Sequence, residues 1–120
     1  MQGILAHHAR RFWNTVVWSL AGWRTAWASE ASLRQWTAVN IASAALALWV
    51  DITPAERAII LGLGLLILAA ELLNTAIETA VNYISTERHP LARKAKDCGS
   101  AGVAVTALAA GVAWVVILLG

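Results

Sequence analysis

The chain has 120 residues, of which 59% are hydrophobic and 13% charged, and its formal net charge is +2. A chain of this length forms one domain, and it carries more apolar side chains than a small water-soluble core can bury, so the composition predicts an integral membrane protein. The small net charge, with no run of Lys and Arg between aromatic residues, gives no support for a nucleic-acid partner, and we expect none.

The first predicted element is a helix over residues 4–28 whose two sides differ. Its apolar side chains recur at steps of three and four residues, which places them along one side of a helix. They are Phe12, Trp13, Val16, Val17, Leu20, Trp23 and Trp27. The opposite side carries Arg11, Asn14 and Ser19, so we expect an amphipathic helix in the lipid headgroup layer. A helix that packs on its own protein has a similar pattern, and this alternative stays open.

The next element is a predicted first membrane span over residues 30–50. Its apolar stretch begins at Trp36 and is short for a span, so we expect the helix to begin near Glu30. Arg34 and Gln35 would then lie at the membrane interface, and Asp51 would follow the helix end.

The second span is predicted over residues 54–84. The sequence Thr53-Pro54-Ala55-Glu56 has a Thr cap, a proline at the first helical position and a Glu three residues after the cap, which is typical of a helix start. A helix of this length measures about 45 Å at about 1.5 Å per residue. Because a hydrocarbon core is about 30 Å thick, we expect the last turns to project from the membrane.

The third span is predicted over residues 91–119, after Pro90. Basic residues are frequent before the first span and in the second connection, whereas the first connection has only Arg57. By the positive-inside tendency, the N-terminus and residues 85–97 face the cytoplasm. The prediction is therefore an all-α, multi-pass membrane protein with a surface helix and three spans in a single domain of residues 1–120.

A polar stripe interrupts the second span. Glu71, Asn74, Thr75, Glu78 and Asn82 follow one another at steps of three, one or four residues and share one helical face. A carboxylate in hydrocarbon is costly and is rarely kept without a partner or a function, so Glu71 and Glu78 are candidate functional residues. Glu71 is expected inside the membrane, and Glu78 at its inner boundary.

Polar residues at the start of the third span are expected at the same depth as the stripe. Lys96, Asp97 and Ser100 lie there, and Gly99 and Gly102 beside them allow close helix approach. With Glu30, these groups would suit Mg²⁺ together with nucleotide phosphates. The alternative is structural: Glu78 pairs with Lys96, and Glu71 is a protonated, hydrogen-bonded carboxyl group in a helix bundle.

Two motifs resemble those of the small prokaryotic diacylglycerol kinases, a family that also contains undecaprenol kinases. Residues 71–78, ELLNTAIE, are similar to its E-x-x-N-[ST]-A-x-E signature, and residues 95–101, AKDCGSA, to its A-K-D-x-[GA]-[SA]-A segment. A further set of residues matches the family's N-terminal pattern. These are Gly22, Arg24, Ala26, Trp27, Glu30, Arg34 and Gln35. The resemblance extends over nearly the whole chain from Arg11.

The resemblance implies a homotrimer in the bacterial cytoplasmic (inner) membrane, with active sites between subunits at the cytoplasmic boundary. It implies transfer of the γ-phosphate of MgATP to a lipid hydroxyl, with Mg²⁺ as cofactor and diacylglycerol as the preferred acceptor, giving phosphatidic acid. Undecaprenol is the alternative acceptor. A catalytically silent membrane protein, or a bundle in which Glu71 and Glu78 relay protons, is a different class of function that the residues also allow.

The resemblance also implies residue roles. Glu71 matches the general base, with Asn74 and Lys96 as further catalytic residues, and Glu30 and Glu78 match the metal-binding acids. The positions implied for the nucleotide are Arg11, Trp18, Glu30, Glu78, Glu87, His89, Lys96 and Asp97. The candidates for lipid binding are Ser19, Trp27, Arg34, Glu71, Ser100 and Trp114. Asn82, Trp18 and Arg88 depart from the residues that are common in the family.

Overall fold

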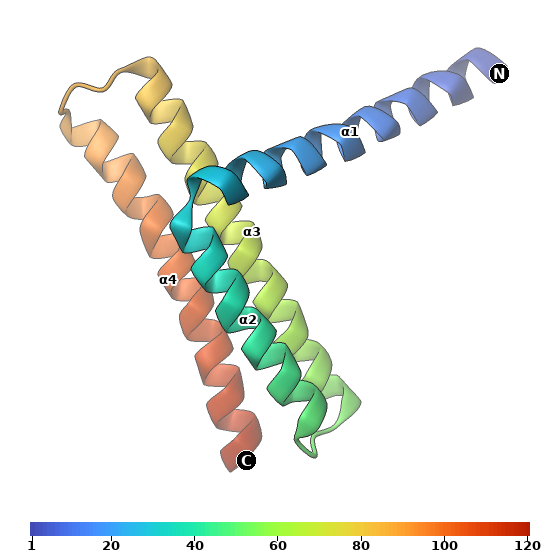
Figure 1. Ribbon diagram of the computed structural model, residues 1–120, viewed down its shortest axis with the longest axis vertical. Coiled ribbons are helices and arrows are strands. Elements are labelled where there is room, and N and C mark those ends of the chain that lie inside the picture. Colours follow the sequence, from blue (N-terminus) through green and yellow to red (C-terminus); the bar gives the residue numbers. More distant parts are fainter.

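The computed structural model describes residues 1–120 as four α-helices joined by short connections (Figure 1). The helices are α1 (Gln2–Ser29), α2 (Ala31–Trp49), α3 (Pro54–Ile84) and α4 (Pro90–Leu119). The all-α prediction is confirmed, and α3 has the bounds expected from the sequence. Figure 1 shows α2, α3 and α4 as an elongated bundle from which α1 projects sideways.

The start of α3 has the predicted cap. The Thr53 side chain accepts a hydrogen bond from the Glu56 backbone N–H at 3.2 Å, and the Thr53 N–H donates to Glu56 Oε1 at 2.9 Å. Two N–H groups that the helix itself cannot pair are thereby satisfied, and Pro54 has no N–H that needs a partner. This local chemistry fixes where the chain turns between α2 and α3.

Arg57 joins the end of α2 to the start of α3. Its guanidinium donates to the backbone carbonyls of Ala47 at 2.8 Å, Val50 at 3.4 Å and Ile52 at 3.2 Å. The last carbonyls of a helix have no partner within it, so a positive side chain at this position satisfies them and opposes the negative end of the helix dipole. Arg57 therefore fixes the antiparallel arrangement of α2 and α3.

Replacing Arg57 with glutamine is expected to lower the free energy of unfolding by about 1–3 kcal/mol, because partly buried carbonyls lose a charged donor. Unfolding of the purified protein in mixed detergent micelles, followed by circular dichroism, measures this change. Arg10→Gln on the exposed part of α1 is the control and should leave the unfolding midpoint unchanged. Equal stability of both variants and the parent protein would contradict the assignment.

The bundle is built around α3. Both α2 and α4 pack along it, whereas α2 and α4 have no Cα atoms within 8 Å of each other. One long side chain links these two helices, because Trp114 of α4 donates from Nε1 to Ser43 Oγ of α2 at 2.8 Å. Helix α3 is therefore the central element of the bundle, and α2 and α4 meet through this side-chain hydrogen bond.

Two helices, α3 and α4, are long and apolar enough to cross a membrane. The predicted first span, α2, is not among them, because Arg34, Gln35, Asn40 and several hydroxyl residues lower its hydropathy. It nevertheless runs beside α3 (Figure 1). Only seven of the 120 residues are buried, so most apolar side chains of the bundle face outward. Such a surface suits contact with lipid or with further copies of the chain.

Helix α1 packs on the bundle only toward its end. Ala26 is its one buried residue, whereas Phe12 and Trp18 are 72% and 68% exposed. Arg34 of α2 donates to the carbonyls of Trp27 and Ala28, which pairs the end of α1 with the start of α2. The alternative that α1 packs along its whole length on its own chain is therefore not seen.

Candidate active site

Close contacts define how α2, α3 and α4 are aligned. The Asn74 side chain of α3 lies against Gly99 of α4, and the Asn40 side chain of α2 lies against Gly64 of α3. Because α2 and α3 are antiparallel and have the same rise per residue, residues equally far from the Asn40–Gly64 contact lie at the same height in the bundle. Glu30 and Asn74 are each ten residues from it, so they lie at the same height. The structure thus brings the start of α2, the polar stripe of α3 and the glycines of α4 to one level.

Glu71 is the one charged side chain that is buried, with 4% of its surface exposed. One helical turn further along the same face, Asn74 Nδ2 donates to Glu78 Oε1 at 3.4 Å. The other amide atom of Asn74, Oδ1, is buried without a hydrogen-bond partner. A buried acceptor without a donor is costly, so this oxygen is available for a group that the chain itself does not supply.

Gly99 is needed for this arrangement. A Cβ atom at position 99 would overlap Asn74 Oδ1, so only glycine allows α4 to approach α3 at the Asn74 side chain. The predicted close approach is thus present at Gly99, whereas a Cβ at Gly102 meets nothing within 4 Å in the chain.

We expect Gly99→Val to lower the lipid kinase activity that the sequence resemblance implies by about tenfold or more, because the added side chain displaces Asn74 and separates α3 from α4 at a cost of about 1–3 kcal/mol. Steady-state assays with unfolding measurements distinguish loss of the site from loss of the fold. Gly111→Val, on the same helix where a Cβ meets nothing within 4 Å, is the matched control. Full activity of Gly99→Val would show that the Asn74 position is not required.

Lys96 lies on α4, about one helical turn before Gly99. Its Nζ donates to Asn82 Oδ1 at 2.8 Å, so its partner on α3 is an amide and not Glu78. The structural alternative of a Glu78–Lys96 ion pair is therefore wrong for this chain, and Lys96 keeps a positive charge that no carboxylate neutralises at that contact.

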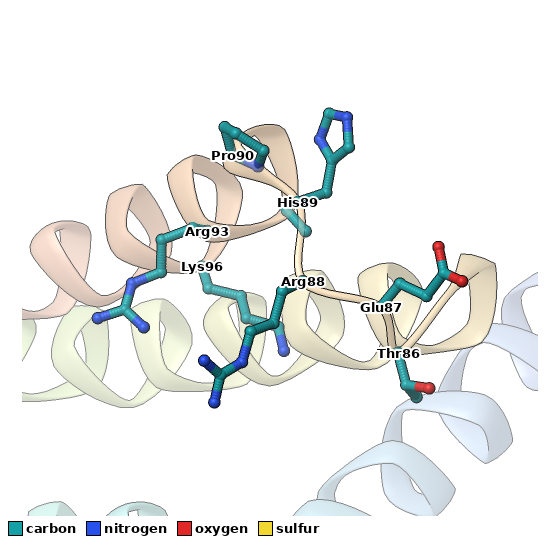
Figure 2. A pocket seen from close by; sticks show the side chains of 8 residues that line it. Thr86, Glu87, Arg88, His89, Pro90, Arg93 and Lys96 are labelled. Carbon is teal, nitrogen blue, oxygen red and sulfur yellow. The ribbon is translucent and has the colours of Figure 1, made fainter.

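An open hollow of about 540 Å³, lined mostly by polar and charged residues, lies at the connection between α3 and α4; it is referred to below as the cavity (Figure 2). Eight residues line it: Thr86, Glu87, Arg88, His89, Pro90, Ala92, Arg93 and Lys96. In Figure 2 the side chains of Arg88, Arg93 and Lys96 extend to one side of the connection, while Glu87 and His89 point away from them. Three cations thus face a space large enough for several phosphate groups.

Comparison with known proteins shows the family to which the chain belongs. A family model described as prokaryotic diacylglycerol kinase matches residues 17–118. The chain belongs to this family. It is 42% identical over 111 residues to a diacylglycerol kinase of Pseudomonas aeruginosa, a match covering 92% of this chain and 90% of the relative. It is also 35% identical over 101 residues to a diacylglycerol kinase of Escherichia coli K12, covering 84% and 83% of the two chains.

Membership in the prokaryotic diacylglycerol kinase family makes the chain a lipid kinase and a membrane protein with helical spans. Both motifs that carried the resemblance lie inside the matched range, and so do Glu30, Glu71, Lys96 and Trp114. Arg11 lies before it, in the part of α1 that projects from the bundle. A single kinase chain therefore groups the residues of α3 and α4 but leaves the first half of α1 apart from them.

The predicted metal residues are not gathered into a closed site in this kinase chain. No group of three or more His, Cys, Asp or Glu side chains is close enough to hold a metal ion. Mg²⁺ in nucleotide sites takes only one or two carboxylates and completes its shell with water and phosphate oxygens. The metal-binding role of Glu30 and Glu78 therefore stays a prediction.

Several residues of the kinase have structural partners that the sequence did not reveal. Asp97 forms an ion pair with Arg93 at 3.2 Å, and His89 Nδ1 accepts a hydrogen bond from the Leu91 N–H at the start of α4. Ser19 donates to Thr15 O at 2.7 Å within α1. The predicted roles of these residues in nucleotide or lipid binding stay predictions.

The sequence interpretation missed part of the cavity lining. The sequence alone gives no functional role to Thr86 or Arg93, and Arg88 stands out in it only as a departure from the family pattern. The one sequence feature that could indicate these residues is the excess of basic side chains in the second connection, which by itself predicts only the orientation of the chain in the membrane. Their convergence depends on the path of the loop, which the local sequence does not define.

Proposed function

We propose that the kinase transfers the γ-phosphate of ATP to the hydroxyl group of diacylglycerol, with Glu71 as the general base. The diacylglycerol kinase activity follows from the family. The burial of Glu71 supports this assignment. Glu71 is the one buried charged side chain, and its helix, α3, is apolar enough to span a membrane. A lipid alcohol can meet a base at that depth.

The reaction requires the base to act on the lipid hydroxyl. Glu71 accepts the hydroxyl proton while the oxygen forms a bond to the γ-phosphorus. The bond between that phosphorus and the bridging oxygen of ADP breaks, so ADP and phosphatidic acid are the products. Because the chain supplies no covalent intermediate in this scheme, its contribution is positioning and charge stabilisation.

The nucleotide is proposed to lie between the level of Asn74 and the cavity at the α3–α4 connection. Lys96 lines that cavity and also reaches Asn82, so its ammonium group can move from the amide to a phosphate oxygen. The unpaired Oδ1 of Asn74 would orient a donor near the γ-phosphate. Glu87, His89 and Asp97 lie at the same end of the bundle.

Glu30 and Glu78 are the residues proposed to hold Mg²⁺. Both are half-buried, and Glu30 is level with Asn74, which donates to Glu78. The ion, when bound, neutralises negative charge on the phosphates. The two carboxylates fix where the phosphate chain ends, and therefore how close it comes to Glu71.

We propose that part of the lipid lies in the cleft between α1 and α3. A hollow of about 840 Å³ lies there, lined by Ser19, Gly22 and Ser29 of α1 and by Thr75 and Thr79 of α3, among others. Trp27, Arg34, Ser100 and Trp114 are the other lipid candidates. Arg11 and Trp18 project from the bundle, and we propose that they reach the nucleotide site of a neighbouring subunit in a homotrimer.

We propose that all 120 residues form one kinase domain with three spans, α2 being the first. The location is the bacterial inner membrane, with the N-terminus and residues 85–97 cytoplasmic. The excess of basic side chains around the cavity supports this orientation, because positively charged connections favour the cytoplasmic side.

The acceptor is tested by supplying purified kinase with ATP and either diacylglycerol or undecaprenol in the same detergent micelles. Preferential formation of phosphatidic acid is expected. Phosphorylation of undecaprenol alone would contradict the proposed acceptor while leaving a lipid kinase, and phosphorylation of neither lipid would contradict the proposed function.

A further inference from the structure

A second cavity, of about 300 Å³, lies between α2 and α3 within the bundle. Thr37, Asn40 and Ser43 of α2 line it together with Gly64 and Leu68 of α3. It is about two helical turns deeper than the level of Glu71, on the side of the α2–α3 connection. Three polar side chains in one part of an otherwise apolar helix pair are costly in lipid and require partners.

Two of these polar side chains have partners in the chain. Thr37 donates to Leu33 O at 2.8 Å, and Ser43 accepts the hydrogen bond from Trp114 Nε1 at 2.8 Å. The amide nitrogen of Asn40 is buried and has no acceptor. Asn40 is thus the one residue of this cavity that requires an acceptor from outside the chain.

Gly64 provides space for the Asn40 carboxamide. A Cβ atom at position 64 would lie 2.9 Å from Asn40 Oδ1, closer than side chains tolerate. Without it, the carboxamide can turn about its terminal torsion, which has a broad energy minimum in asparagine. The Nδ2 group can therefore be presented to the cavity that Asn40 lines.

The proposed base lies further along α3 than the residues that line this cavity. Leu68 lines it, and Glu71 follows three residues later on the same face of α3. Asn40 is level with Gly64, seven residues before Glu71, which corresponds to about 10 Å along the helix. Side chains lean toward the N-terminus of their own helix, so Asn40 on α2 and Glu71 on antiparallel α3 lean toward each other and shorten this separation.

We propose that Asn40 donates a hydrogen bond to an ester carbonyl of diacylglycerol while Glu71 receives its hydroxyl group. The glycerol backbone carries the hydroxyl and the ester carbonyls a few bonds apart, which suits the separation of the two side chains, and an acyl chain fills the cavity below. A polyprenol has no carbonyl, so Asn40 favours a glycerolipid acceptor. This inference rests on the proposed function and names the group by which its acceptor is recognised.

The test compares two acceptors that differ only in the carbonyl groups. The kcat/KM for dioleoylglycerol and for the matched dialkylglycerol ether is measured in detergent micelles for the parent kinase and for Asn40→Leu. One hydrogen bond corresponds to about tenfold in kcat/KM, so the parent kinase should prefer the ester by about that factor. Asn40→Leu should lose the preference and keep its activity toward the ether.

Thr106→Val is the matched control, because its hydroxyl donates to Gly102 O at 2.8 Å in the same helix and has no role at the cavity. It should keep the ester preference of the parent. An unchanged ester preference in Asn40→Leu would overturn the inference while the kinase activity stands. A smaller oligomer by light scattering, with equal loss on both lipids, would show that Asn40 pairs with a second copy instead. Inactivity of the parent kinase toward both lipids would contradict the proposed function itself.

Discussion

Replacement of Glu71 by glutamine should reduce kcat for diacylglycerol phosphorylation by about 10²–10⁴-fold, the range typical of a lost general base. Glutamine has almost the same shape and cannot accept the hydroxyl proton as a carboxylate does. The KM for MgATP should change little, because Glu71 is buried in the bundle and does not line the cavity at the α3–α4 connection. Steady-state kinetics with varied MgATP and varied lipid separate the two parameters.

Asp51→Asn is the control for this experiment, since it also removes one carboxylate but lies in the connection between α2 and α3, at the opposite end of the bundle from the cavity. It should retain parental kcat. If Glu71→Gln kept full ATP-dependent activity, the general-base assignment would be wrong. A large rise in the KM for MgATP at constant kcat would instead place Glu71 at the nucleotide.

Replacement of Lys96 by methionine is expected to lower kcat/KM for MgATP by about 10²–10³-fold, the loss typical when one charge-stabilising donor is removed. Methionine keeps the length of the side chain but removes the ammonium group that reaches Asn82 and lines the cavity. Calorimetry with a non-hydrolysable ATP analogue measures how much of the loss in kcat/KM comes from weaker nucleotide binding before the reaction.

Lys94→Met gives the matched control, because Lys94 is on the same helix and does not line the cavity. It should bind the analogue as the parent does. Equal analogue binding and equal turnover in Lys96→Met would exclude a phosphate contact. The two predictions are complementary, since one variant should affect the chemical step and the other the use of the nucleotide.

Features that depend on neighbouring residues in the sequence could be predicted. The cap formed by Thr53 and Glu56 is present as expected, because both partners lie within one turn. The shared face of Asn74 and Glu78 follows from helical periodicity, and the structure shows their hydrogen bond. The close approach at Gly99 was predicted from a small residue beside a polar one, although its partner, Asn74, was identified only by the structure.

Features that depend on how helices are aligned could not be predicted. The sequence offered Glu78 as a partner for Lys96, but the lysine side chain leans toward the start of α4 and reaches Asn82. The convergence of Arg88 and Arg93 on one cavity depends on the path of the α3–α4 connection. Asn40 lies among other polar residues of α2, and the lack of a partner for its side-chain nitrogen could be recognised only from the structure, in which Gly64 lies beside it.

The roles proposed for Glu71 and Glu78 differ because the two residues lie at different depths along α3. Seven residues separate Glu71 from Glu78, which is about 10 Å along the helix. The buried Glu71 can meet a lipid alcohol, while the half-buried Glu78 can meet a hydrated ion at the phosphates. In the proposed assignment, one helix carries both the residue for the lipid acceptor and a residue for the metal-bound phosphates.

The most direct test of a lipid kinase acting on diacylglycerol uses ATP labelled either at the γ-phosphate or at the α-phosphate. Purified protein is incubated with diacylglycerol in mixed micelles, and the lipid fraction is separated and counted. Label should enter phosphatidic acid from γ-labelled ATP and not from α-labelled ATP. Absence of label from phosphatidic acid with the γ-labelled nucleotide, under conditions in which the protein is folded, would contradict the account.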